Sequence, residues 1–216
     1  MKGKLTELVF ILDESGSMHD LVDDTIGGFN SMIRKQKSVE GECLVSVVLF
    51  NQGQEVLYDR VLLPDIPMMT TNEYNPGGLT ALLDAMGGAI HHIGNVHKYA
   101  RNTDRPAHTL FIITTDGLEN ASHRYGADRV RSMVERQKSR YGWEFLFLGA
   151  NIDTVETARH YGIDESRAVR FHNDSKGIAI NYDVIEEVVH HVRSGKGIDR
   201  SWKTQAEKDY DGRQKA

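Results

Sequence analysis

A carboxylate and two hydroxyl side chains follow an apolar run near the start of the chain. Residues 8–12 read Leu-Val-Phe-Ile-Leu, which is typical of a buried strand, and Asp13, Ser15 and Ser17 come next. A strand that ends in this way presents oxygen atoms at the edge of its sheet, and such ligands suit a divalent cation of the Mg²⁺ or Mn²⁺ type. The spacing therefore indicates a metal site, although on their own Ser15 and Ser17 would serve as helix caps.

Two further polar turns lie later in the chain. Residues 75–80 read Asn-Pro-Gly-Gly-Leu-Thr and precede a long helix, and the apolar run 109–115 ends in Asp116 and Gly117. Open α/β sheets bind ligands beyond the carboxyl ends of their strands, at the point where the strand order reverses. If the first and fourth strands are neighbours at that point, five oxygen-bearing side chains converge around one cation. These are Asp13, Ser15, Ser17, Thr80 and Asp116.

Alternating strand and helix patterns position these turns. The patterns predict strands at 5–12, 44–50, 55–63, 109–115, 145–149 and 168–172, with helices at 20–36, 79–93, 130–137, 154–161 and 182–192. Only residues 51–54 separate the second strand from the third, so we expect a hairpin and an antiparallel third strand at the sheet edge. The prediction is an α/β fold with a mostly parallel six-stranded sheet and helices on both faces.

Length and composition limit the kind of protein. The chain has 216 residues, which suits one domain at 1–193, and the apolar periodicity stops before a charged tail at 194–216 that we expect to be flexible. The net charge of −5 argues against nucleic-acid binding, and the single Cys43 excludes a disulfide framework. No apolar stretch approaches a membrane span and no convincing signal peptide is present, so the default expectation is a cytoplasmic protein without membrane contact.

The three motifs resemble the metal-ion-dependent adhesion site of von Willebrand factor A domains. The resemblance rests on Asp-x-Ser-x-Ser at 13–17, Gly-Gly-Leu-Thr at 77–80 and Thr-Asp-Gly at 115–117, and it covers roughly residues 5–193. It implies a doubly wound, Rossmann-like fold with strand order 3-2-1-4-5-6 and a bound Mg²⁺ or Mn²⁺. It also implies that Ser15, Ser17 and Thr80 contact the metal directly, and that Asp13 and Asp116 do so directly or through water.

Several neighbouring residues could shape the ligand surface. We expect the rim of the site to include Glu14, Met18, His19, Gly78, Gly117 and Asn151. A solvated loop is the equal alternative for Glu14, Met18 and His19. Asp84, one helical turn after Thr80, could orient that turn or could be an exposed helix carboxylate, and Asn120 could fix its loop by bonding to backbone.

Two classes of function compete. The resemblance implies a docking module without enzymatic activity, in which an Asp or Glu of a partner protein completes the metal coordination. A multiprotein or AAA-ATPase-associated assembly is the setting that the resemblance suggests. The alternative is a Mg²⁺-dependent phosphatase or phosphotransferase that uses Asp13. Such enzymes need an acid or base two residues further on, where this chain has Ser15, so the sequence favours binding. A phosphoacceptor switch domain ranks last, because Asp13 is the only well-placed carboxylate after the first strand.

Overall fold

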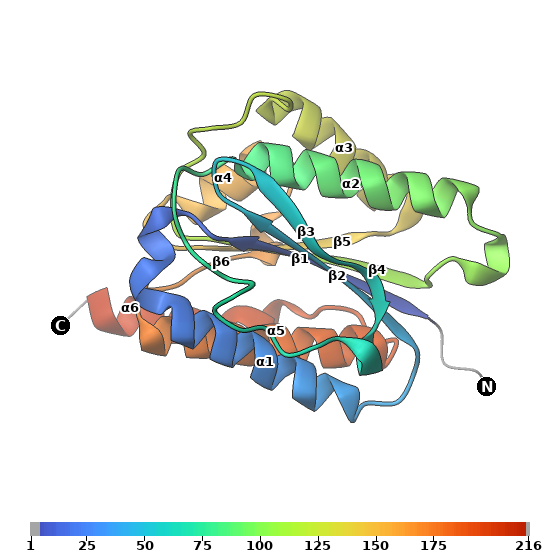
Figure 1. Cartoon of the computed structure of the whole chain (residues 1–216), viewed down its shortest axis with the longest axis horizontal. Coiled ribbons are helices and arrows are strands. Elements are labelled where there is room, and N and C mark those ends of the chain that lie inside the picture. The colour runs from blue at the N-terminus through green and yellow to red at the C-terminus, as the bar shows by residue number, and fades with distance from the viewer. Residues whose placement is uncertain (1–4, 215–216) are drawn as a thin grey trace.

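The computed structural model describes residues 5–214 and contains a single six-stranded sheet. The strands lie in the order β3-β2-β1-β4-β5-β6, and every neighbouring pair is parallel except β2 and β3, which are antiparallel. The predicted fold class, strand order and antiparallel edge strand are confirmed (Figure 1). The strands are β1 (Thr6–Asp13), β2 (Cys43–Phe50), β3 (Gln54–Leu62), β4 (His108–Thr115), β5 (Glu144–Gly149) and β6 (Ala168–Arg170).

Helices cover both faces of the sheet, as Figure 1 shows. One face carries α1 (Val22–Lys37), α5 (Ser175–Arg193) and α6 (Thr204–Gln214), and the other carries α2 (Leu82–Tyr99), α3 (Ala127–Tyr141) and α4 (Thr154–His160). All eight residues of β1 are buried, because this central strand is covered from both sides. No helix within residues 5–214 is long and apolar enough to cross a membrane.

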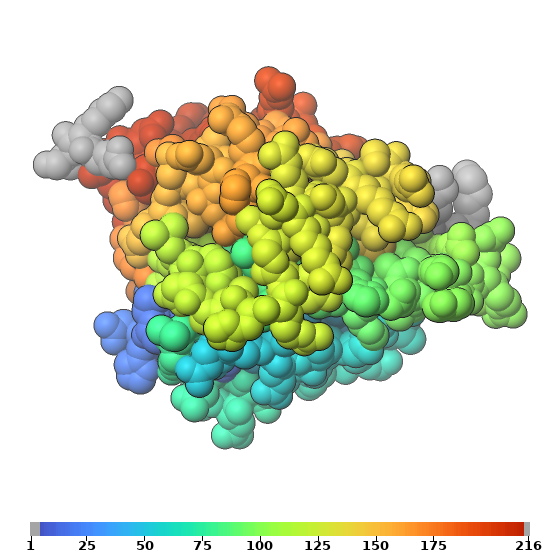
Figure 2. Space-filling model, turned by 90° about the horizontal axis from the view of Figure 1, so that it is seen from above, coloured from blue at the N-terminus to red at the C-terminus, as the bar shows by residue number. Residues whose placement is uncertain are grey.

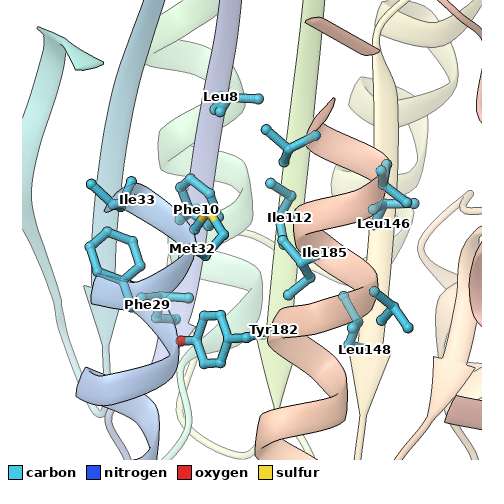
Figure 3. Close-up of a cluster of buried hydrophobic side chains, with 14 of the residues drawn as sticks. Leu8, Phe10, Phe29, Met32, Ile33, Ile112, Leu146, Leu148, Tyr182 and Ile185 are labelled. Atoms are coloured by element: carbon cyan, nitrogen blue, oxygen red, sulfur yellow. The ribbon is translucent and has the colours of Figure 1, made fainter. Parts of the chain in front are cut away.

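The core beneath α1 and α5 holds these helices against the sheet (Figure 3). The two helices approach so closely that a Cβ atom at Gly28 would lie 2.1 Å from the ring of Tyr182. Only glycine fits there without repacking, which explains why a helix-weakening residue stands in the middle of α1. The side chains that fill this region include Phe29, Met32 and Ile33 of α1, Tyr182 and Ile185 of α5, and Leu8, Phe10, Ile112, Leu146 and Leu148 of the strands.

Residues 194–214, part of the tail predicted to be flexible, fold onto the domain in the structure. They form the short 3-10 helix η5 (Arg200–Lys203) followed by α6, and the side chain of Trp202 is only 4% exposed. The indole N–H of Trp202 donates a hydrogen bond to the carbonyl oxygen of Ser166 at 2.9 Å, and Ala206 is buried next to it. The sequence offers Trp202 as a large apolar anchor among charges, and a single aromatic side chain can pack on the domain without apolar periodicity.

Two helix starts differ from the sequence-based prediction in a way that affects the site. Residues Gly16–Leu21 form a 3-10 helix, η1, before α1 begins at Val22. Helix α2 begins at Leu82, so Thr80 lies in the preceding loop and not within the helix. Ser17 therefore lies in a short 3-10 helix and Thr80 lies in a loop, and contacts with neighbouring segments set the conformation of both.

Candidate metal centre

Asp13 and Asp116 lie next to each other because the sheet reverses its order between β1 and β4. Strand β1 pairs with β2 on one side and with β4 on the other, and Leu12 faces Thr114 in the parallel register. Asp13 is the last residue of β1, and Asp116 follows the last residue of β4. Two carboxylates thus meet at the carboxyl edge of the sheet, where the sequence predicted a ligand site.

A chain of hydrogen bonds joins four of the five predicted metal ligands. The amide N–H of Ser15 donates to Asp13 Oδ1 at 2.8 Å, and the hydroxyl of Ser17 donates to Asp116 Oδ1 at 2.6 Å. The two serine hydroxyl oxygens lie 3.1 Å apart. The structure therefore brings Asp13, Ser15, Ser17 and Asp116 into one cluster of oxygen atoms.

The fifth residue, Thr80, lies beside the turn that follows Asp116, and its backbone bonds to Asn120. Its amide N–H donates to Asn120 Oδ1 at 2.9 Å, and its carbonyl accepts from the Asn120 N–H at 3.0 Å. A Cβ atom built on Gly117 would lie 3.6 Å from Thr80 Oγ1, so the hydroxyl faces the turn that follows Asp116. Within residues 5–214, this hydroxyl forms no hydrogen bond with the other four candidates. Asn120 fixes the loop by bonding to backbone, as the sequence suggested.

The loop before Thr80 docks directly on the loop after β1. The N–H of Gly77 donates to the carbonyl of Glu14 at 2.9 Å, and the N–H of Gly16 donates to the carbonyl of Gly78 at 3.2 Å. Gly78 has a positive φ of 79°, and a Cβ atom there would lie 2.9 Å from the side-chain oxygen of Gln52. Glycine is therefore favoured at this position mainly for its conformation, since the flexible, exposed Gln52 side chain could move away from a larger residue.

The electrostatic environment of Asp13 is unusual for a buried carboxylate. Its side chain accepts hydrogen bonds from the Thr115 hydroxyl at 2.6 Å and from the amide of Asp116 at 3.4 Å, and the residue is 2% exposed. Among the described residues no Lys, Arg or His forms an ion pair with Asp13 or Asp116. Burial raises the pKa of Asp13, hydrogen bonds oppose this in part, and the Asp116 charge adds to the increase.

The donor set fits a hard divalent cation. No group of three or more His, Cys, Asp or Glu side chains that could hold a metal occurs within residues 5–214, so a metal here would depend on hydroxyl ligands. Two carboxylates and three hydroxyls are all oxygen donors, which Mg²⁺ and Mn²⁺ prefer to nitrogen or sulfur. A cation would also supply the positive charge that the protein does not provide to Asp13 and Asp116.

The predicted rim residues have different roles in the structure. Glu14 is half-buried, and its carboxylate accepts the N–H of Asn75 at 2.6 Å, so it pins the adjacent loop. His19 is exposed. Met18, expected on the rim, is instead 5% exposed and packs in the core, because η1 turns its side chain inward. Asn151 has a positive φ of 56° and donates to the Asp116 carbonyl at 3.3 Å.

One residue of the site was missed by the sequence analysis. The amide nitrogen of Asn173 donates to Asp116 Oδ2 at 2.8 Å, and its side-chain oxygen is buried without a hydrogen-bond partner. Asn173 lies in the loop between β6 and α5, which ends at the same edge of the sheet. The rule that parallel strands share a carboxyl edge could have identified it, since it is the first amide after the sixth strand.

The loop after β4 is organised by a carboxylate on α2. Asp84 accepts the backbone N–H groups of His123, Arg124 and Tyr125 at 3.0, 2.9 and 2.8 Å. These bonds lower the pKa of Asp84 despite partial desolvation. Asp84 therefore orders the chain beyond the Asp116 turn and is neither a free surface carboxylate nor a support for the turn that contains Thr80.

Comparison with known proteins identifies the fold. No protein-family model matches the chain, and no curated protein is similar to it. The D319A mutant of the PilB minor pilin from Streptococcus sanguinis is similar over 90% of this chain and 64% of that one, with 12% identity and a TM-score of 0.65. The vWF domain of the type V pili tip protein Mfa5 from Porphyromonas gingivalis matches over 91% and 98%, with 11% identity and a TM-score of 0.64. The fold is that of a von Willebrand factor type A domain.

A third similar structure carries an occupied metal site. Proximal thread matrix protein 1 from the mussel byssus, with a zinc-occupied MIDAS motif, matches 87% of this chain and 46% of that one, with 11% identity and a TM-score of 0.60. The chain spans from about half to two thirds of the length of the mussel and pilin proteins. At these identities the likeness establishes the fold alone. The cytoplasmic location expected from the sequence receives no support from matrix and pilus proteins.

Proposed function

We propose that this von Willebrand factor type A domain is a metal-dependent docking module. Asp13, Ser15, Ser17, Thr80 and Asp116 would hold a Mg²⁺ or Mn²⁺ ion, and an Asp or Glu of a partner protein would complete its coordination. The ion, when bound, supplies a Lewis-acidic positive centre at the protein surface. The chain's own residues would position the ion, and the partner's carboxylate would take the remaining coordination position.

The observation that carries this proposal is the uncompensated pair Asp13 and Asp116. Both carboxylates are 2% exposed, and they are surrounded by neutral hydroxyl and amide donors. Burial of the carboxylate is the main cause of the raised pKa of Asp13, and repulsion from the nearby Asp116 charge adds to it. A divalent cation would neutralise the two negative charges of Asp13 and Asp116. The occupied site would then not repel an incoming acidic side chain.

The zinc-occupied motif of the mussel protein supports divalent metal binding by this fold, and pilus and matrix proteins of the same fold suit a role in protein assembly. The choice of Mg²⁺ or Mn²⁺ rests on the oxygen-only donor set. An assembly driven by an AAA-type ATPase stays a prediction from the sequence resemblance. So does the absence of catalysis, for which Ser15 at the position of an enzyme's acid or base is the argument.

The test has two stages, the first of which is metal binding. Titration calorimetry should detect one Mn²⁺ site in the wild-type protein, and D13N should abolish it. Asp20 provides a matched control, because it is an exposed aspartate on η1 outside the hydrogen-bonded cluster, so D20N should bind Mn²⁺ like the wild type. Absence of Mn²⁺ binding at millimolar concentration would overturn the proposal.

The second stage concerns the partner. Immobilised protein should retain a partner in Mg²⁺ or Mn²⁺ and release it in excess chelator, and T80A should weaken retention without unfolding the domain. Mutation of acidic residues in the captured partner should have the same effect. A partner that remains bound with equal affinity in chelator would show that the metal centre is not the docking surface. Turnover of phosphoesters with Mg²⁺ would favour the enzymatic alternative.

A further inference from the structure

A second candidate site lies between α2 and α3, on the face of the sheet opposite α1 and α5. A cavity of about 630 Å³ is lined there by residues from Ile90 to Lys98 of α2, from Arg129 to Tyr141 of α3, and by the loop residues Arg105 and Pro106. Figure 2 looks onto this face of the molecule. The volume lies within the range of small-molecule sites, which is roughly 300–1,000 Å³. Thr80 precedes the opposite, N-terminal end of α2, so the groove is separate from the metal centre.

The lining of this groove is cationic. Lys98, Arg105, Arg129 and Arg136 contribute to it, and no Asp or Glu does. None of these four side chains forms an ion pair with a carboxylate within residues 5–214. The whole chain carries a net charge of −5, so this groove concentrates uncompensated positive charge on a protein that is acidic overall.

Two arginines close to the groove, by contrast, have carboxylate partners. On the same helix α3, the exposed Arg131 pairs with Glu135 at 2.9 Å, and before β4 Arg101 pairs with Asp104 at 2.6 Å. In the groove, Arg105 meets only the carbonyl oxygen of Lys98 at 3.4 Å, and Arg129 lies 4.7 Å from the centre of the Tyr125 ring. Neither contact neutralises a guanidinium charge.

Uncharged groups in the same groove offer further contacts for an organic ligand. The side-chain amide of Gln137 lines the groove, and its oxygen is buried without a hydrogen-bond partner. Tyr141, also in the lining, is 59% exposed and presents an aromatic surface. Guanidinium groups bind phosphate oxygens through paired N–H donors, and an aromatic ring can stack on a planar base.

We propose that this groove binds a small phosphorylated anion with several negative charges, of which a nucleoside di- or triphosphate is the best match. The phosphate groups would lie among Lys98, Arg105, Arg129 and Arg136, and the organic part would lie toward Gln137 and Tyr141. This inference is independent of the metal centre and extends the docking module to a second ligand on another face.

Binding is measured by calorimetry with ATP, pyrophosphate and inorganic phosphate, all in excess chelator so that the metal centre cannot contribute. ATP and pyrophosphate should bind more tightly than inorganic phosphate, because they engage more of the cations. The double variant R105Q/R136Q should weaken ATP binding by about a hundredfold, since a charge-assisted contact contributes roughly tenfold or more. Y141A should weaken ATP and leave pyrophosphate unchanged if the nucleoside stacks there.

The matched control is R140Q, which removes the same charge from α3 at an exposed position outside the groove lining. It should bind ATP within about twofold of the wild type, because screened surface charges act weakly at this range. Failure of ATP and pyrophosphate to bind at about 10 mM, a range in which even weak millimolar sites are detected, would overturn the proposal. Equal losses in R140Q and in R105Q/R136Q would also overturn it, since they would indicate a general charge effect.

Discussion

Strand β1 carries two buried carboxylates, Glu7 and Asp13, which differ in whether the fold supplies a positively charged partner. Glu7 lies at the start of β1 and has no exposed surface, and its two oxygens meet Arg60 Nε at 2.5 Å and the ring of His97. Asp13 lies at the end of the strand, is 2% exposed, and meets hydroxyl and amide groups without a cation. The two residues lie roughly 20 Å apart along the strand, which rises about 3.3 Å per residue.

The difference separates a structural charge from a functional one. Glu7 has Arg60 as a positive partner inside the protein and also meets the His97 ring, so its ion pair with Arg60 is complete as soon as the chain folds. Asp13 shares its site with Asp116 and has no positively charged side chain as a partner. The folded protein therefore holds two buried carboxylates at the edge of the sheet whose negative charge is not compensated. The comparison predicts that loss of Glu7 harms the fold, whereas loss of Asp13 harms only binding.

The largest expected effect is that of E7Q. It leaves Arg60 and His97 partly buried without their carboxylate, and removal of one member of a buried pair costs about 3 kcal/mol of unfolding free energy. Urea denaturation should show a lower midpoint. The control E144Q removes the partner of Arg167 in a pair whose carboxylate is 42% exposed, and it should cost less than about 1 kcal/mol. Equal costs for both variants would remove the structural role assigned to Glu7.

The next effect uses Cys43 as a reporter of unfolding. Burial raises the pKa of this thiol to about 12, and the residue is 1% exposed, so iodoacetamide at pH 8 should label it only when the chain opens. At ten times its Kd, Mn²⁺ should slow labelling about tenfold in the wild type, because it binds the native state alone. D13N should show no such protection. Protection of D13N to the same degree would place the metal elsewhere.

The Cys43 thiol also gives a pH dependence with a defined sign. Its folded pKa lies above the unfolded value of about 9, so the folded state holds the proton more tightly. Stability from this group is fully present below about pH 9 and is lost as the pH rises toward 12. The variant C43A should remove this alkaline loss, which urea midpoints measured between pH 8 and 10.5 would detect as a flatter profile.

The smallest effect is expected for D13N without metal. Removal of one charge from an unpaired buried carboxylate should change the unfolding free energy by less than about 1 kcal/mol, because lost hydrogen bonds and relieved repulsion offset each other. Burial raises the pKa of Asp13 in the folded state above the unfolded value of 3.8. In metal-free protein the stability contributed by this residue is therefore lost as the pH rises from 3.8 through the folded pKa. D13N should lack this decrease. A loss as large as that of E7Q would make Asp13 a structural residue.

Much of this architecture could be predicted from local sequence patterns. The apolar runs identified all six strands to within two residues, and the short connection at 51–54 indicated the antiparallel edge. Asp13 and Asp116 were recognisable because each follows a buried strand. In contrast, the bond from Asn173 to Asp116 joins residues 57 positions apart in the sequence, and the bond from Trp202 to Ser166 joins residues 36 positions apart. No local periodicity in the sequence predicts such contacts.

The sequence by itself determined the six strands, the main helices between them and the oxygen-bearing residues at the strand ends, because hydrophobic periodicity and residue chemistry are local properties. Only the tertiary structure decided which charges are compensated. Glu7 and Asp13 occupy equivalent positions at the two ends of one strand, yet Arg60 and His97 reach only the first, through β3 and α2. The electrostatic state of a buried carboxylate depends on which distant side chains the fold brings within a few ångströms of it, and that information lies in the packing of the elements.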